Sequence, residues 1–218
     1  MLSYKHGFHA GNHADVLKHI VLIYLYKLQK KHNKSISYID THSGNGLYKY
    51  ISKYMEKNKE YKHGIKKIEK YVGENKLIKN YLNILKNISK NNNFYPGSPL
   101  IISSLSSNSD KLYFCELHNN EFDSLKKNLN KFTNIKNINT DGFEYLEKKL
   151  DYNKEYFILI DPSYEIKDDF FKINHILDNL EKYGSSKILI WYPILNYEDN
   201  DRFIENLRKK GISRIINF

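Results

Sequence analysis

Four consecutive residues, Asp161-Pro162-Ser163-Tyr164, combine a carboxylate, a rigid turn and an aromatic ring. They follow directly on the apolar run 156–160, whose composition predicts a buried strand. A carboxylate and a neighbouring backbone carbonyl can each accept one hydrogen bond from an amino group. Because the residue before a proline is held extended, the carboxylate is directed away from the strand end. The tetrapeptide therefore predicts a polar site beside an aromatic ring at the end of this strand.

Three other apolar runs also end in residues that suit a ligand site. The first is followed by the segment 40–46 (Asp-Thr-His-Ser-Gly-Asn-Gly), the second by Glu116 and the third by Asp141-Gly142. Glycines let a backbone approach a ligand closely, Glu116 is placed to bind ribose hydroxyls, and Asp141 could bind an adenine amine. Each acid taken singly is better explained as a loop residue or a helix N-cap, and a lone Gly-x-Gly is a weak signal. Four such segments in order favour one shared site.

The elements that must position these residues alternate along the chain. Strands are expected at 35–40, 111–117, 135–140, 156–161, 187–192 and 213–218, and helices at 13–31, 120–129, 143–150, 168–182 and 199–210. Such alternation predicts an α/β fold with a mostly parallel sheet and helices on both faces. In open parallel sheets, ligands bind beyond the carboxyl ends of the strands. All four polar segments are expected at that edge.

Residues from about 48 to 93 break the alternation. They contain no convincing strand, but two lysine-rich helical patterns, at about 60–72 and 76–89. A segment of about 45 residues buries too little apolar surface to fold alone. We therefore expect a helical insertion within a single domain that spans residues 1–218.

The composition limits the class of protein. A net charge of +10 suits a polyanionic partner. However, 32 lysines against three arginines indicate a skewed composition, so the charge alone is equally compatible with neutral drift. The single cysteine, Cys115, excludes an intramolecular disulfide and fits a reducing compartment. No long apolar stretch predicts a signal peptide or a membrane span, and we expect a cytoplasmic protein.

The sequence as a whole resembles the RlmJ family of bacterial 23S ribosomal RNA adenine-N6 methyltransferases. Amino-methyltransferases carry a D/N-P-P-Y/F/W tetrapeptide that holds the exocyclic amine of a flipped base against S-adenosylmethionine. The resemblance runs in consistent order from residue 1 to about 218. Its most specific part is the block 2–19. It also rests on the segments Asp40-Thr41-His42, Tyr95-Pro96-Gly97-Ser98-Pro99, Glu116-Leu117-His118, Asp141-Gly142-Phe143 and Trp191-Tyr192-Pro193.

This resemblance implies a Rossmann-like class I methyltransferase fold, S-adenosyl-L-methionine as cofactor, 23S ribosomal RNA as substrate and a monomeric enzyme. It also implies that the helical insertion takes part in RNA docking. The implied catalytic residues are Asp161, Pro162 and Tyr164. The implied substrate-binding residues are Tyr4, His6 and Lys18. The implied cofactor-binding residues are His19, His42, Ser98, Glu116, Asp141, Gly142 and Asp161.

Six of the nine histidines lie within the first 42 residues. A metal site is one interpretation, because His9 and His13 could share a helix face. No carboxylate accompanies them in an H-E-x-x-H pattern, so we predict no metal. We favour a polar lining that, with Lys18, contacts the cofactor carboxylate and RNA phosphate.

Two departures from the family pattern bear on activity. Ser163 replaces the second proline, so the turn is less rigid. Ordering it should cost about 1 kcal/mol, which corresponds to a several-fold slower reaction. The family's sheet normally ends with an antiparallel strand and a tail, whereas this sequence stops at Phe218. We therefore expect the C-terminal antiparallel strand to be missing, which would leave a sheet edge unpaired.

Two other functions compete with RNA methylation. A non-catalytic RNA- or cofactor-binding relic is favoured by Ser163 and the short C-terminus. A DNA adenine-N6 methyltransferase shares the tetrapeptide, but not the N-terminal block 2–19. A nicotinamide-dependent enzyme would also need an acid after the second strand, but its chemistry does not require a D-P-x-Y segment after the fourth strand.

Overall fold

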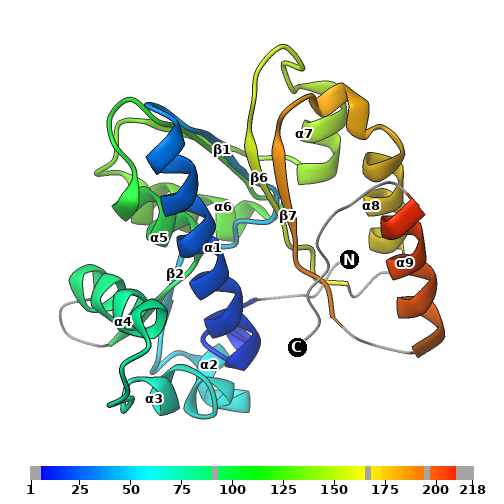
Figure 1. The fold of residues 1–218 in the computed structure, drawn as a ribbon. Helices are drawn as coiled ribbons and strands as arrows, with labels where there is room; N and C mark the ends of the chain where they lie inside the picture. Colours follow the sequence, from blue (N-terminus) through cyan, green and yellow to red (C-terminus); the bar gives the residue numbers. More distant parts are fainter. Residues whose placement is uncertain (1–5, 90–92, 165–167, 194–196, 210–218) are drawn as a thin grey trace.

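Five parallel strands form the central sheet of the computed structural model, which describes residues 6–89, 93–164, 168–193 and 197–209 (Figure 1). Their order is β5-β4-β1-β6-β7, and every neighbouring pair is parallel. The order reverses between β1 and β6, which is where ligands bind in sheets of this kind. The strands are β1 (Ser37–Asp40), β4 (Lys111–Cys115), β5 (Ile135–Ile138), β6 (Phe157–Ile160) and β7 (Lys187–Ile190).

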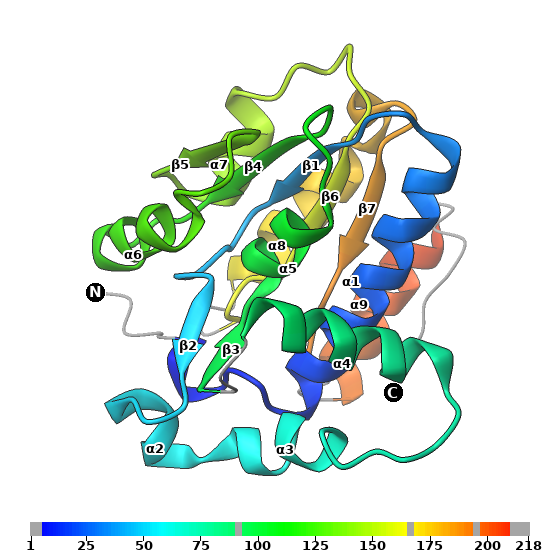
Figure 2. The ribbon, with the colours of Figure 1, turned by 90° about the vertical axis from the view of Figure 1, so that its left-hand side faces the viewer.

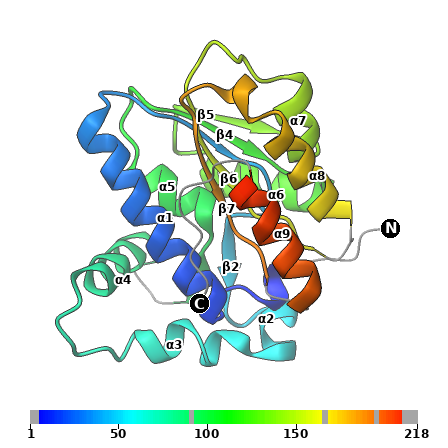
Figure 3. The same cartoon turned by 45° about the vertical axis from the view of Figure 1, so that its right-hand side comes forward.

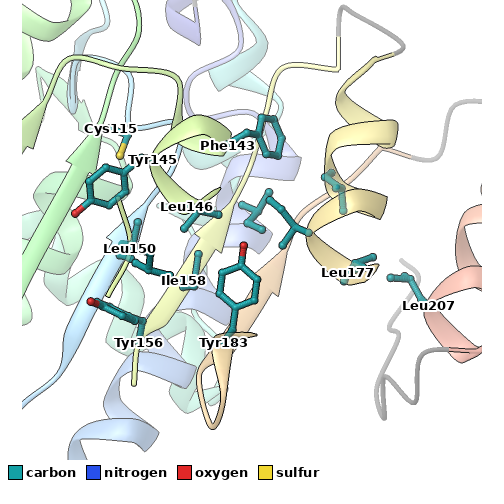
Figure 4. Packing of buried hydrophobic residues seen from close by; sticks show 14 of the residues in the cluster. Cys115, Phe143, Tyr145, Leu146, Leu150, Tyr156, Ile158, Leu177, Tyr183 and Leu207 are labelled. Carbon is teal, nitrogen blue, oxygen red and sulfur yellow. The ribbon is translucent and has the colours of Figure 1, made fainter. Parts of the chain in front are cut away.

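Helices cover both faces of this sheet (Figure 3). Neighbouring residues of a strand point to opposite faces, and β1 shows this at its centre. Tyr38 packs with apolar side chains of α1, α5 and α6, and Ile39 with those of α7, α8 and α9. Figure 4 shows the second of these clusters, with Leu146 of α7, Leu177 of α8 and Leu207 of α9. The predicted α/β architecture is therefore confirmed. The helices are α1 (His13–His32), α5 (Ser98–Leu105), α6 (Asn119–Leu129), α7 (Gly142–Lys148), α8 (Asp168–Asp178) and α9 (Tyr197–Lys209).

Most predicted elements differ from the structure only at their ends. The helix expected at 168–182 ends at Asp178 and is followed by the 3-10 helix η3 (Leu180–Tyr183). Helix α5 was not predicted, because it is short and six of its eight residues are buried, so its sequence shows no one-sided apolar pattern. The strand expected at 213–218, and with it the expected loss of the last antiparallel strand, lies outside the described residues.

The segment between β1 and α5 carries a second, two-stranded sheet (Figure 2). Strand β2 (Leu47–Lys49) pairs antiparallel with β3 (Phe94–Pro96). Strands of three residues give too little pattern to be found in a sequence, and we missed both. The helix expected at 60–72 is instead two short helices. The helical elements are α2 (Lys53–Asn58), η2 (Glu60–Lys62), α3 (Ile65–Ile68) and α4 (Lys76–Ile88).

This segment is packed on the main body rather than standing apart. Met55, Ile65 and Tyr81 share one apolar cluster with Val16 and Ile23 of α1. The insertion therefore rests on the helix that also carries Lys18 and His19. No helix in the described part of the chain is long and apolar enough to cross a membrane.

Candidate active site at the carboxyl edge of the sheet

A cavity of about 360 Å³ lies where the loops after all five parallel strands meet the N-terminal segment. This volume lies within the range of small-ligand sites. Tyr4 lies outside the described residues. Every other predicted catalytic, cofactor-binding or substrate-binding residue lines the cavity, and these residues are His6, Lys18, His19, His42, Ser98, Glu116, Asp141, Gly142, Asp161, Pro162 and Tyr164. The structure therefore brings together residues that are up to 158 positions apart in the sequence.

The loop after β1 is held against Glu116. Gly44 and Gly46 have φ values of 58° and 75°, which favour glycine. The Gly44 amide donates to Glu116 Oε2 (2.8 Å), and the His118 amide donates to Oε1 (2.7 Å). Burial raises the pKa of the Glu116 carboxyl in spite of these bonds. Each oxygen has a second lone pair, so Glu116 is oriented by backbone and can still accept from ligand hydroxyls.

Asp141 begins helix α7 and closes another side of the cavity. Its Oδ1 accepts from the Phe143 amide (2.8 Å) and its Oδ2 from Lys172 Nζ (3.2 Å). Burial alone would raise its pKa, but these two bonds prevail and lower it. At Gly142, an added Cβ atom would come within 2.0 Å of the Thr41 carbonyl oxygen. The start of α7 thus lies directly on the loop after β1, where a side chain has no room.

The tetrapeptide leaves β6 next to the point where the strand order reverses. Asp161 Oδ2 lies 2.5 Å from Lys18 Nζ. Tyr164 has a left-handed φ of 55°, which costs a non-glycine residue about 1 kcal/mol. Two hydrogen bonds hold this conformation. The Tyr164 amide donates to Asp169 Oδ2 (3.0 Å), and the Tyr164 hydroxyl donates to the Trp191 carbonyl (2.7 Å). These bonds fix the turn independently of the serine at the third position.

Lys18 belongs to a chain of contacting polar side chains that sequence reasoning found only in part. Lys18 Nζ lies 2.8 Å from Asp15 Oδ1, and His6 Nε2 lies 2.9 Å from Asp15 Oδ2. Asp15 was not predicted as a site residue. A lysine three positions after an acid on a helix is a recognisable spacing, but its burial could not be read from the sequence. The order along this chain of contacts is His6, Asp15, Lys18 and Asp161.

Two other predicted residues, His19 and His42, are neutral parts of the cavity wall. His19 is 1% exposed, its Nδ1 lies 2.8 Å from the Tyr95 hydroxyl, and burial lowers its pKa to about 3. His42 Nδ1 lies 2.7 Å from Thr41 Oγ1, and burial lowers its pKa to about 4. Near neutral pH both can serve a ligand only as hydrogen-bonding groups, not as cations.

The possible metal pair and Ser98 have other partners. His9 precedes α1 instead of sharing a helix face with His13, and its Nδ1 lies 2.9 Å from Glu60 Oε1. Within the described ranges, no three His, Cys, Asp or Glu side chains are grouped so that they could hold a metal ion. Ser98 donates to the buried Asp40 Oδ2 at 2.7 Å, and burial raises the pKa of Asp40 to about 6.

The buried histidines predict a loss of stability in acid. Between about pH 6.5 and pH 4, unfolded His19 and His42 bind protons that they do not bind when folded. The free energy of unfolding therefore falls as the pH falls, by about 1.4 kcal/mol per pH unit for each histidine. The raised pKa of Asp40 has the opposite effect on the free energy of unfolding between about pH 4 and pH 6. In that range it offsets about as much of the loss as one histidine causes. Urea unfolding at a series of pH values measures the slope. Replacing His19 by glutamine should flatten it, and an unchanged slope would contradict this assignment.

The strand order, the acids at the strand ends and the D-P-x-Y turn together define a Rossmann-like class I methyltransferase domain. A family model described as "Ribosomal RNA large subunit methyltransferase D, RlmJ" matches residues 33–218. The chain therefore belongs to the RlmJ family, as its sequence motifs indicated.

Individual relatives agree with this assignment. The chain is 35% identical to the "Ribosomal RNA large subunit methyltransferase J" of Escherichia coli, over 99% of this chain and 79% of the relative. The protein of the same name from Haemophilus influenzae is also 35% identical, with the same coverage. A crystal structure of a Legionella pneumophila protein superposes with a TM-score of 0.83 at 33% identity, over 92% of this chain and 75% of that one.

Proposed function

We propose that this protein transfers a methyl group from S-adenosylmethionine to the N6 amine of an adenine in 23S ribosomal RNA. The observation that carries the proposal is the Asp161 carboxylate, which leaves the sheet at its switch point, faces the cavity and is held by Lys18 at 2.5 Å. Membership of the RlmJ family supports the RNA substrate. We further propose that the enzyme is a cytoplasmic monomer.

The residues of the cavity fit such a cofactor. Glu116, oriented by two backbone amides, suits the ribose hydroxyls. Gly142 lets the start of α7 pack directly on Thr41, and this places Asp141 at the cavity wall, where it could bind an adenine amine. Neutral His19 and His42 offer hydrogen bonds to its amino-acid end. When bound, the cofactor supplies an electrophilic methyl group.

Adenine N6 is a poor nucleophile because its lone pair is delocalised into the ring. We assign Asp161 Oδ1 and the Pro162 carbonyl as acceptors for the two N6–H bonds, with Oδ2 held by Lys18. Two such bonds favour a pyramidal nitrogen and direct its lone pair, so positioning and electrostatics supply most of the rate gain. Tyr164, whose ring is fixed by its bonded hydroxyl, would stack on the flipped base. Tyr4, His6 or water then takes the proton that N6 must lose.

The insertion is the strongest candidate for RNA docking. Residues 47–96 carry twelve lysines against four glutamates, a net charge of +8 out of the +10 of the whole chain. Such a concentration of lysines suits the phosphate backbone, whose neutralisation gives affinity without sequence preference. We propose that the insertion binds the RNA phosphate backbone, while the cavity selects the base.

A tritium-transfer assay tests the proposed function. The protein is incubated with methyl-labelled S-adenosylmethionine and either unmodified 23S RNA or duplex DNA of the same sequence. We expect label in the RNA alone, recovered as N6-methyladenosine after digestion. Cofactor binding without transfer would indicate a non-catalytic binding protein. Transfer to DNA but not to RNA would indicate a DNA adenine methyltransferase.

A further inference from the structure

Asp15 is the point where three parts of the N-terminal region meet. It is the third residue of α1 and only 3% exposed. Its Oδ1 lies 2.8 Å from Lys18 Nζ, and its Oδ2 lies 2.9 Å from both His6 Nε2 and the Gly11 amide nitrogen. One carboxylate thus contacts two side chains of the cavity and the loop between them.

Lys18 is held between two carboxylates and is itself only 4% exposed. A cation buried to this degree requires anionic partners, and its position follows theirs. Asp15 lies one turn before Lys18 on the same helix, so its place relative to Lys18 is set by the helix itself. Asp161 lies on a loop after β6 and contacts the same Nζ. Asp15 is therefore the fixed anchor, and Asp161 is the group that the lysine holds in place.

We infer that Asp15 is a positioning residue, which fixes Lys18 and His6 around the Asp161 carboxylate without itself contacting the adenine. The inference rests on the proposed methyl transfer. Because Asp15 shares the charge of Lys18, Asp161 keeps its capacity to accept a hydrogen bond from the amine. Without the Asp15 charge, Lys18 would be attracted more strongly to Asp161, and His6 would lose its ion pair with Asp15.

A purely structural role is the competing explanation. The Asp15 amide donates to the Asn12 side chain (2.9 Å), while the Asp15 carboxylate accepts from the Gly11 amide, an arrangement that caps the start of α1. Asp15→Asn separates the two roles, because the amide keeps one oxygen for Gly11 and removes the charge. A cap alone would change stability and leave the rate constant of the bound complex unaffected.

Asp110→Asn is the matched control. Asp110 is 1% exposed and also pairs with a lysine of α1, since Lys30 Nζ lies 2.8 Å from its Oδ1. It directly precedes β4 and therefore lies at the opposite edge of the parallel sheet. Both variants should lower the melting temperature. We expect kcat for methyl transfer to fall about 100-fold in Asp15→Asn and less than about two-fold in Asp110→Asn. Equal losses of kcat in the two variants, or a loss below about three-fold in Asp15→Asn, would overturn the inference.

A second measurement does not depend on activity. With selectively labelled lysine, NMR follows the ammonium group of Lys18, which is ordered by its contacts with Asp15 and Asp161. Its protons should exchange with water faster in Asp15→Asn than in the wild type or in Asp110→Asn. An unchanged exchange rate would overturn the anchoring role, even if the enzyme is active. An absence of methyl transfer by the wild type would count against the proposed function, and the exchange rate would still decide whether Asp15 anchors Lys18.

Discussion

Replacing Asp161 by alanine is expected to lower the rate of methyl transfer by roughly 1,000-fold, a loss typical of removing a preorganised electrostatic group. The carboxylate is the acceptor that we assign to the amine, and it also pairs with the buried Lys18. Among the residues that the structure describes, its loss leaves Lys18 paired with Asp15 alone. Because its side chain is 17% exposed, the effect on folding should be smaller than the effect on the rate. Single-turnover tritium transfer with saturating cofactor measures the change.

Asp161→Asn is the matched variant, since it keeps the size of the side chain and one acceptor oxygen. Lys18 Nζ at 2.5 Å would attract that oxygen, which turns the NH₂ group towards the amine. We therefore expect an intermediate loss of about 10- to 100-fold. Binding of S-adenosylhomocysteine by calorimetry should show that both variants still hold the cofactor product. If the alanine variant keeps more than a tenth of the wild-type rate, then Asp161 is not the group that positions the amine.

Much of the fold could be predicted because its elements differ clearly in pattern. All four residues of β6 are buried, as expected of a parallel strand covered on both faces. The alternation of strands with helices then required a parallel sheet. What could not be predicted are elements that depend on their surroundings. Strands β2 and β3 exist only because each pairs with the other, and α5 is short and mostly buried, so it lacks a one-sided helical pattern.

The site was predictable where one residue follows a strand, and less so where contacts join distant segments. Glu116, Asp141 and Asp161 follow strands and were found on that basis. The partners of these acids were not found, because a sequence pattern does not show that Lys18 crosses to the loop after β6, or that Lys172 of α8 reaches Asp141. Family resemblance indicated Lys18, but not the bond that it makes.

The second large effect is expected at Gly142, where alanine should both destabilise the fold and disrupt the cofactor site. The added Cβ would lie 2.0 Å from the Thr41 carbonyl oxygen and 2.6 Å from its carbonyl carbon. Thr41 has little freedom to move, because its amide and its hydroxyl both bind the Leu159 carbonyl (3.1 and 2.9 Å). We expect a loss of about 3 kcal/mol in the free energy of unfolding.

The clash between the Cβ added at Gly142 and Thr41 should also disturb the cofactor site, because the residues next to these two positions form part of the cavity wall. Asp141 precedes Gly142, and His42 follows Thr41. If α7 shifts away to relieve the clash, Asp141 moves with it, and cofactor affinity should fall by at least about ten-fold, since a misplacement of about 1 Å is enough for such losses. Calorimetry with S-adenosylhomocysteine measures this at a temperature where the variant is folded.

Gly184→Ala is the control that separates steric clash from backbone strain. Gly184 has a φ of 53°, and an added Cβ there meets nothing within 4 Å. It lies between η3 and β7, at the amino end of the strand and away from the cavity. Alanine should cost about 1 kcal/mol for the left-handed backbone and leave cofactor affinity unchanged. Equal affinities in the two variants would mean that α7 can move without disturbing Asp141, and that the contact with Thr41 serves packing alone.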